Sequence, residues 1–194
     1  MLSRLLRQNV ASWAIPIAAR LPFSPNALTV AGVAFAAGGA ALFAVGAFQL
    51  ASLALFMSGT ADVLDGATAR LRGTGHSVRG AFVDSAADRV SDNLIYGGML
   101  FYYVSLPTGS PVAVIAIFVA ASASNIASYI KTRSESVGIP CNAGFFKRQE
   151  RFAVIMTAAL FGPDLFVWAL VVLAVFALES MTTRLLYAYR RMTP

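Results

Sequence analysis

Long apolar runs constrain the fold of this chain more than any other feature. Apolar stretches follow one another at 27–48, 50–72, 81–104, 111–133, 149–163 and 165–187, of which the fifth is the shortest. A helix needs about 20 mostly apolar residues to cross the roughly 30 Å hydrocarbon core. Composition agrees, because 58% of the 194 residues are hydrophobic and only 12% are charged, which is unusual for a soluble domain. The runs predict an all-α membrane protein with six transmembrane helices.

The segment before the first run has a different character. Residues 1–22 are expected to form a juxtamembrane element, because 3–20 mix leucines and other apolar residues with arginines. This mixture predicts an amphipathic helix that lies on the membrane surface. No short apolar core with a small-residue cleavage site marks a removable signal peptide. Residues 23–194 are then expected to form the six-helix bundle, so that 1–194 is a single membrane domain.

Basic residues test this topology independently. All 15 Lys and Arg residues except Arg89 lie before the first run, around the second and fourth connections, or near and after the end of the last run. Lys and Arg concentrate on the cytoplasmic side of membrane proteins. We therefore expect a multi-pass protein of the cell membrane with both termini in the cytoplasm. The formal net charge of +6 follows from this asymmetry, and no nucleic-acid partner is expected.

Several carboxylates lie within the apolar runs, where a charged side chain is energetically unfavourable. Asp62, Asp65, Asp84, Asp88 and Asp92 account for five of the nine acidic residues, and the runs place them in two neighbouring helices and near the loop between them. A charged Asp near the centre of a membrane helix costs about 2.5–3.5 kcal/mol, so such a group marks a functional site.

The spacing of these residues predicts where they meet. Asp62 and Asp65 are three positions apart, and Asp84 and Asp88 are four apart, so each pair lies on one side of its helix. A short loop makes the two helices antiparallel, which brings the pairs together at the cytoplasmic side. Like charges this close need cations. Oxygen ligands favour Mg²⁺ or Mn²⁺, and two such ions could bridge a phosphate.

A longer pattern contains both pairs. It reads Asp62-x-x-Asp65-Gly66-x-x-Ala69-Arg70 and then Gly80-x-x-x-Asp84-x-x-x-Asp88. The pattern resembles the signature of the CDP-alcohol phosphotransferase family, whose members are six-helix membrane enzymes with a di-metal site. The resemblance spans nearly the whole chain. It implies transfer of a phosphatidyl-type group from a CDP-linked lipid to a hydroxyl of a small polar alcohol, with release of CMP, by a homodimer.

The resemblance also implies roles for individual residues. Asp62, Asp65 and Asp84 would bind two Mg²⁺ or Mn²⁺ ions, and Asp88 would bind metal or act as the catalytic general base. The implied CDP-lipid site consists of Pro25, Asn26, Thr29, Asp62, Gly66 and Arg70. Within it, the family's Pro-Asn-x-x-Thr element corresponds to residues 25–29. From the residues alone, Ser24 and Asn26 could equally form a helix cap.

Two stretches resemble the branch of the family that uses inositol phosphate as acceptor. The first is residues 79–92, and the second combines residues 129–135 with 148–151. The resemblance implies a cationic pocket for the phosphate of inositol 1-phosphate, formed by Lys131, Arg133, Arg148 and Arg151. Lys147 and Gln149 depart from that branch, which has Glu and Pro there. Glycerol 3-phosphate, serine and other polyol phosphates stay open as acceptors.

A cation transporter or channel is the alternative from another class, because carboxylates inside a membrane also line ion paths. Transporters often contain inverted repeats, whereas the acidic motif occurs once in this sequence. His76, between the two halves of the motif, is expected to be an exposed loop residue. Asp92, one helical turn beyond Asp88, is expected to support the metal ligands rather than to bind metal.

Overall fold

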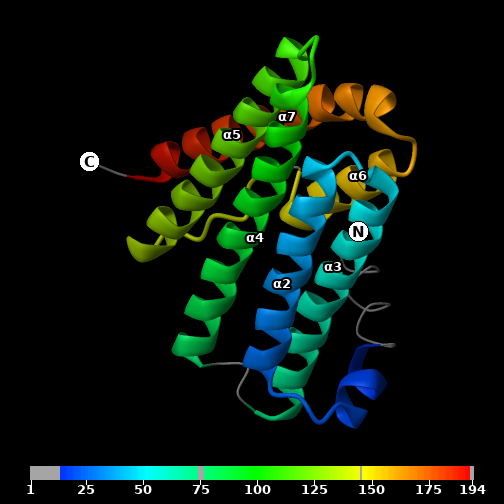
Figure 1. Cartoon of the computed structure of the whole chain (residues 1–194). Coiled ribbons are helices and arrows are strands. Elements are labelled where there is room, and N and C mark those ends of the chain that lie inside the picture. Colours follow the sequence, from blue (N-terminus) through cyan, green and yellow to red (C-terminus); the bar gives the residue numbers. More distant parts are fainter. Residues whose placement is uncertain (1–13, 74–76, 145, 193–194) are drawn as a thin grey trace.

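The chain folds into helices joined by short connections (Figure 1). The computed structural model describes residues 14–73, 77–144 and 146–192. Residues 14–20 form a short first helix. The longer helices that follow are α2 (Pro25–Ala44), α3 (Phe48–Leu71), α4 (Val78–Ser105), α5 (Pro111–Ser136), α6 (Arg148–Ala159) and α7 (Pro163–Arg191). The all-α prediction is confirmed.

Local sequence signals explain where the helices begin. Ser24 Oγ accepts a hydrogen bond from the Ala27 amide at 3.2 Å, so Ser24 is the N-cap of α2. Pro25, Pro111 and Pro163 each stand in the first turn of a helix, where the missing N–H is not needed and the fixed φ suits the helix. The turn between α2 and α3 contains Gly46, whose φ of 80° is strained for other residues.

The helices differ in their capacity to cross a membrane. Three of those described, α2, α5 and α7, are long and apolar enough by length and composition. The helices α3 and α4 have 24 and 28 residues but contain the aspartates. The helix α6 does not extend over the predicted run 149–163. It has 12 residues, and at 1.5 Å per residue it is about 18 Å long, too short to cross by itself.

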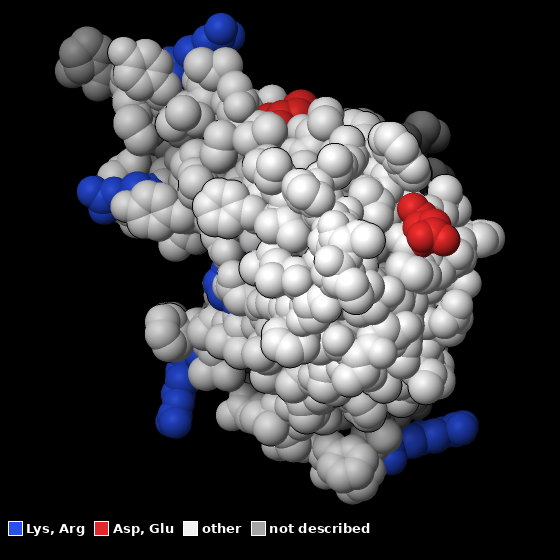
Figure 2. Space-filling view, turned by 45° about the horizontal axis from the view of Figure 1, so that its top comes forward, with Lys and Arg blue, Asp and Glu red and all other residues white. Residues whose placement is uncertain are grey.

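Apolar side chains cover much of the outside of the bundle. Val30, Phe118 and Trp168, one on each of the three candidate spans, keep 67% of their surface exposed. Figure 2 shows a broad face almost without charged side chains, with Lys and Arg at its margins. Exposed apolar surface of this extent is typical of a protein whose solvent is lipid.

The helix α2 lies between α3 and α4, and the short connections make it antiparallel to α3 and parallel to α4 (Figure 1). Glycines permit this close packing. A Cβ on Gly98 of α4 would overlap the Ala40 carbonyl of α2, and a Cβ on Gly39 would overlap the Leu55 side chain of α3. Small residues at helix contacts are characteristic of membrane bundles. The helix α5 packs on α4 and α7, and α6 packs on α3 and α7.

The described part of the predicted amphipathic helix packs on α3. Ala14 and Ala18 are buried together with Ala67, against Val63 and Leu64. The segment 14–20 therefore lies beside the aspartate-containing half of α3. The rest of the predicted helix, 3–13, lies outside the described residues.

Candidate active site

Four carboxylates line one cavity between α3 and α4. Asp62 and Asp65 lie in the second half of α3, and Asp84 and Asp88 lie in the first half of α4. Carboxylate oxygens of Asp62, Asp84 and Asp88 lie within 4.8 Å of one another. The structure therefore brings the two pairs together, as their spacing on antiparallel helices predicts.

The helix α2 also lines this cavity, beside α3 and α4. Gly32 lines the cavity, and its carbonyl accepts a hydrogen bond from Ser58 Oγ at 2.8 Å. A Cβ on Gly32 would lie 3.5 Å from the Ala61 Cβ and from the Ser58 carbonyl oxygen. These distances are ordinary van der Waals contacts, so α2 and α3 pack directly on each other beside the aspartates.

Asp65 is more enclosed than the other three carboxylates, since only 7% of its surface is exposed. Its Oδ2 accepts a hydrogen bond of 2.7 Å from Thr29 Oγ1, which joins α2 to α3. Thr29 Oγ1 also lies 3.1 Å from the Pro25 carbonyl oxygen. A carboxylate is the stronger acceptor, so Thr29 fixes the orientation of Asp65 at the edge of the cavity.

Arg148 provides the closest positive charge to the cluster. Its Nη1 lies 2.7 Å from Asp88 Oδ1 and 3.8 Å from Asp62 Oδ1. Its Nε donates a hydrogen bond of 2.9 Å to Asp92 Oδ1. The guanidinium also lies over the Phe152 ring, 5.3 Å from the centroid. Arg148 is the first residue of α6, so the short helix α6 brings a cation to carboxylates of α3 and α4.

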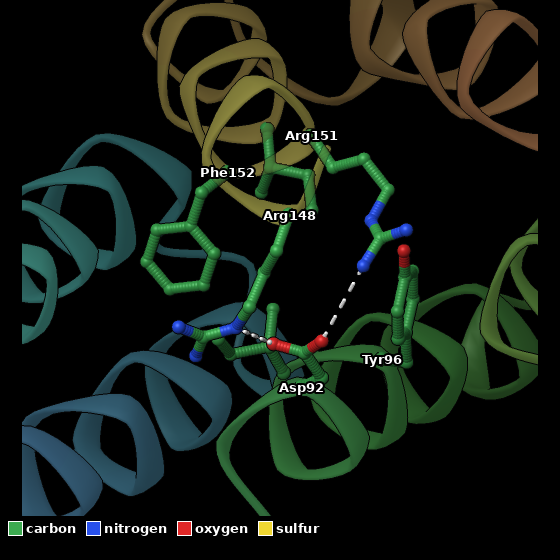
Figure 3. Close-up of a pocket in the computed structure, with 7 residues that line it drawn as sticks. Asp92, Tyr96, Arg148, Arg151 and Phe152 are labelled. Carbon is green, nitrogen blue, oxygen red and sulfur yellow. Dashed lines mark hydrogen bonds and ion pairs between the residues drawn. The ribbon is translucent and has the colours of Figure 1, made fainter. Parts of the chain in front are cut away.

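A second cavity lies on the other side of Arg148 (Figure 3). Arg151 and Tyr96 line it and are both buried. Figure 3 shows the Arg151 guanidinium beside the Tyr96 hydroxyl, with Asp92 between the two arginines. Because Arg148 lines both cavities, it connects a carboxylate-rich space with one lined by two arginines, Asp92, Tyr96 and apolar side chains.

Of the residues predicted for the CDP-lipid site, Thr29 and Asp62 line the first cavity, and the other four lie outside its lining on α2 and α3. Pro25 and Asn26 begin α2, and Asn26 is exposed. Gly66 and Arg70 continue from Asp65 along α3, where a Cβ on Gly66 would lie 3.4 Å from Arg70 Nη1. Of Ser24 and Asn26, the two residues that could cap this helix, Ser24 is the N-cap of α2.

The four cations predicted for the acceptor pocket form two groups. Arg148 and Arg151 lie at the cavities, whereas Lys131 and Arg133 lie in the last turns of α5. Lys131 Nζ is 3.9 Å from Glu135 Oε1, and Arg133 is exposed. His76 lies outside the described residues.

Sequence reasoning gave no role to Arg89, yet the structure places it against the site. Its Nη2 lies 3.8 Å from Asp92 Oδ2 and 4.0 Å from Asp88 Oδ2, and its Nη1 donates a hydrogen bond to Ser128 of α5. The sequence contains a signal for this position, because Arg89 stands alone within an apolar run and such an arginine needs a nearby negative charge.

The residues of the first cavity fit a hard divalent cation. The side chains that converge offer carboxylate oxygens, which suit Mg²⁺ or Mn²⁺ better than softer metals. Their mutual repulsion also favours cation binding. Arg148 neutralises part of this charge in the structure.

Comparisons with known proteins show the family of this chain. The family model described as CDP-alcohol phosphatidyltransferase matches residues 23–181. The archaetidylinositol phosphate synthase of Methanothermobacter thermautotrophicus is 32% identical over 181 residues, covering 91% of this chain and 89% of that protein. The phosphatidylinositol phosphate synthase of Mycobacteroides abscessus is 32% identical over 190 residues, covering 93% of this chain and 86% of that protein.

Solved structures give the same result. Phosphatidylinositol phosphate synthase of Mycobacterium tuberculosis with CDP-DAG bound matches with a TM-score of 0.83 and 30% identity, over 94% of this chain and 100% of that chain. The structure of that enzyme with manganese and citrate gives a TM-score of 0.82 and 29% identity, over 93% of each chain. This chain is a multi-pass integral membrane protein, and it belongs to the CDP-alcohol phosphatidyltransferase family of enzymes.

Proposed function

We propose that this enzyme transfers the phosphatidyl group of a CDP-linked lipid to a hydroxyl of inositol 1-phosphate and releases CMP. The observation that carries the proposal is the position of Arg148 between a cavity of four carboxylates and a cavity that contains Arg151. The first cavity has the chemistry to hold divalent cations and a diphosphate. The second has the chemistry to hold the phosphate of an acceptor.

The carboxylates Asp62, Asp65, Asp84 and Asp88 would hold two Mg²⁺ or Mn²⁺ ions. Such ions, when bound, neutralise the charge on the diphosphate and stabilise the leaving oxygen. The support in this chain is the 4.8 Å convergence of three carboxylates and the Thr29 hydrogen bond that orients the fourth. The Mycobacterium tuberculosis relative has been solved with manganese.

The donor would lie along α2 and α3. We assign its CDP group to a site formed by Pro25, Asn26, Thr29, Asp62, Gly66 and Arg70. Arg70 is exposed at the last turn of α3, where its planar fork can reach a phosphate. The Mycobacterium tuberculosis relative has been solved with CDP-DAG, which supports a donor of this class.

The transfer needs one base and one leaving group. Asp88 takes the proton of the acceptor hydroxyl, whose oxygen then bonds to the lipid-linked phosphorus. The bond between that phosphorus and the oxygen of CMP breaks, so that CMP leaves with the electron pair. Asp88 suits this role because it borders the cavity and is half-buried, and because a base must reach the hydroxyl directly.

The identity of the acceptor and the residues that bind it are a separate part of the proposal. Arg148 and Arg151 would bind its phosphate at the cavities, and Lys131 and Arg133 would bind it from the end of α5. The names of the two curated relatives, which are inositol phosphate lipid synthases, support inositol 1-phosphate. Glycerol 3-phosphate, serine and other polyol phosphates are the alternatives.

We also propose the orientation of the protein in the membrane. The bundle spans the membrane with α2, α3, α4, α5, α7 and a sixth segment that includes α6. Both termini and the active site face the cytoplasm, since basic residues gather at the ends of the helices that carry the site. A homodimer is part of the same proposal and is tested by the mass of the protein in detergent.

The experiment is an assay of CMP release by purified protein with CDP-diacylglycerol and Mg²⁺. Inositol 1-phosphate, inositol, glycerol 3-phosphate and serine are supplied one at a time. We expect release with inositol 1-phosphate and none with inositol, because the two differ only in the phosphate. Asp88→Asn and a chelator should abolish release, and Asp164→Asn, which removes a carboxylate at the start of α7, should not. Release with another acceptor alone would reject inositol 1-phosphate.

A further inference from the structure

Asp92 is a buried carboxylate whose two oxygens both face arginines. Only 7% of its surface is exposed. Its Oδ1 accepts a hydrogen bond of 2.9 Å from Arg148 Nε. Its Oδ2 lies 3.8 Å from Nη2 of Arg151 and 3.8 Å from Nη2 of Arg89. A carboxylate enclosed in this way is stable only with such partners.

Asp92 is separated from the carboxylates of the first cavity by Arg148. It lines the second cavity, whereas Asp62, Asp84 and Asp88 line the first. The three carboxylates whose oxygens converge do not include it. An effect of Asp92 on those carboxylates can therefore pass through its charge, through Arg148, or through Arg89, whose Nη2 also lies 4.0 Å from Asp88 Oδ2.

Arg148 is shared between the two groups of carboxylates. Its Nε is bonded to Asp92, while its Nη1 lies 2.7 Å from Asp88 and 3.8 Å from Asp62. A guanidinium at this distance competes with a cation for the oxygens of Asp88 and Asp62. While Nε is bonded to Asp92, that carboxylate neutralises part of the charge of Arg148, so that Arg148 competes less strongly with a cation for Asp88 and Asp62.

We infer that Asp92 is a positioning residue, which holds Arg148 between the two cavities and thereby sets the affinity of the carboxylates for a divalent cation. The inference rests on the proposed metal role of Asp62, Asp84 and Asp88. It goes beyond that role because it assigns the control of metal affinity to a residue that does not contact the metal. Partners of this kind commonly change metal affinity by about 10–100-fold.

The test is a double-mutant cycle read by Mn²⁺ binding. Free Mn²⁺ is measured by its paramagnetic resonance signal during titration of purified protein in detergent, without lipid donor or acceptor. The proteins are wild type, Asp92→Asn, Arg148→Gln, the double variant and the control Asp164→Asn. A cycle separates an effect that passes through Arg148 from one that does not.

We expect Asp92→Asn to raise the dissociation constant for Mn²⁺ about tenfold, because Asp92 then no longer neutralises part of the charge that Arg148 directs at Asp88 and Asp62. Arg148→Gln should lower the constant, since it removes the competing cation. In the Arg148→Gln background, Asp92→Asn should change the constant by less than about twofold. Asp164→Asn should leave it unchanged.

An equal effect of Asp92→Asn in both backgrounds would overturn the inference, because Asp92 would then act by its charge or through Arg89 and not through Arg148. No effect in the wild-type background would overturn it as well. Failure of wild type to bind Mn²⁺ would reject the metal site and this inference together, and would thus be distinguishable from failure of the inference alone.

A second variant covers the case in which Asp92→Asn does not fold. Asp92→Glu keeps the charge and moves the carboxylate by one methylene group. The Mn²⁺ affinity of Asp92→Glu should differ from that of wild type. The double variant Asp92→Glu, Arg148→Gln should have the same Mn²⁺ affinity as Arg148→Gln alone. A profile in which Asp92→Glu changes affinity equally in both backgrounds contradicts a positioning role. Gel filtration and circular dichroism establish that each protein is folded before titration.

Discussion

The two ends of the bundle formed by α2, α3 and α4 are built from different side chains. At one end, Phe43 and Phe48 pack with Phe166 of α7, with ring centroids 5.1 Å apart for Phe48 and Phe166. All three rings are fully buried, and Tyr103 Oη donates a hydrogen bond of 2.8 Å to the Pro163 carbonyl. At the other end, Asp62 and its neighbouring carboxylates surround a cavity.

This difference separates stability from function along the same helices. Buried rings gain free energy from burial and from edge-on contacts, and no buried charge opposes that gain. The carboxylates repel one another and lose hydration, so their end of the bundle is held by Arg148, Thr29 and the cations that bind there. Substitutions at the two ends should therefore have opposite consequences.

The largest effect is expected at the carboxylate end. Asp88→Asn should lower the rate of CMP release by about 10²–10⁴-fold, the usual cost of losing a general base. The melting temperature should change little, because Asn keeps the size of the side chain and the relief of repulsion among the carboxylates offsets the loss of the Arg148 ion pair. Activity and thermal unfolding of the same preparation are compared. A variant that retains most activity would reject Asp88 as the base.

The aromatic end should give the converse result. Phe48→Ala should reduce the free energy of unfolding by about 3–5 kcal/mol, since a buried ring is replaced by a cavity. The affinity for Mn²⁺ of the folded protein should be unchanged. Unfolding by detergent titration and Mn²⁺ titration provide the two readings. Weaker Mn²⁺ binding by folded Phe48→Ala would mean that the two ends are not independent.

Metal should stabilise the protein through one end only. At a free Mn²⁺ concentration 100 times its dissociation constant, the stability should rise by about 2.7 kcal/mol. The increase should be lost in Asp84→Asn and on addition of a chelator, and it should persist in Phe48→Ala. Thermal unfolding with and without Mn²⁺ measures it. Equal stabilisation of Asp84→Asn would place the metal elsewhere.

Gly98 tests the helix contact between the two ends. A Cβ at this position would overlap the Ala40 carbonyl, whereas a Cβ on the neighbouring Gly97 meets no atom within 4 Å. Gly98→Ala should therefore cost about 1–3 kcal/mol, and Gly97→Ala should be neutral or slightly stabilising. Thermal unfolding compares the pair. Equal melting temperatures would show that α2 and α4 can separate without cost.

The smallest effect is expected for the hydrogen bond between α2 and α3. Thr29→Val removes the donor to Asp65 and should cost about 1 kcal/mol of stability, with weaker Mn²⁺ binding. Thr60→Val is the matched control, because Thr60 Oγ1 donates only to the Phe56 carbonyl one turn earlier on an exposed part of α3. The account would be contradicted if both variants weakened Mn²⁺ binding equally.

Much of this arrangement could be predicted from the sequence, because it depends on local signals. Ser24 and the prolines at positions 25, 111 and 163 mark helix starts. The spacing of Asp62, Asp65, Asp84 and Asp88 is sufficient to bring the pairs together once a short loop makes α3 and α4 antiparallel. These features need no knowledge of contacts between distant segments.

The rest depends on contacts between distant segments. The end of α6 at Ala159 could not be predicted from the apolar run 149–163, because hydropathy does not distinguish a short helix followed by a turn from a spanning helix. Arg148 has the sequence signature of any cytoplasmic loop arginine, and only the fold places it between Asp88 and Asp92. The bond between Thr29 and Asp65 is hidden for the same reason.

The most direct test of the central claim follows the phosphorus that is transferred. Wild-type protein is incubated with inositol 1-phosphate, Mg²⁺ and a CDP-linked lipid that carries radiolabel on its lipid-linked phosphorus only. The account predicts that the label moves to a new phospholipid containing inositol phosphate while the released CMP is unlabelled. Label in the released nucleotide would contradict the proposed bond cleavage, and unchanged donor with every acceptor would contradict the proposed reaction.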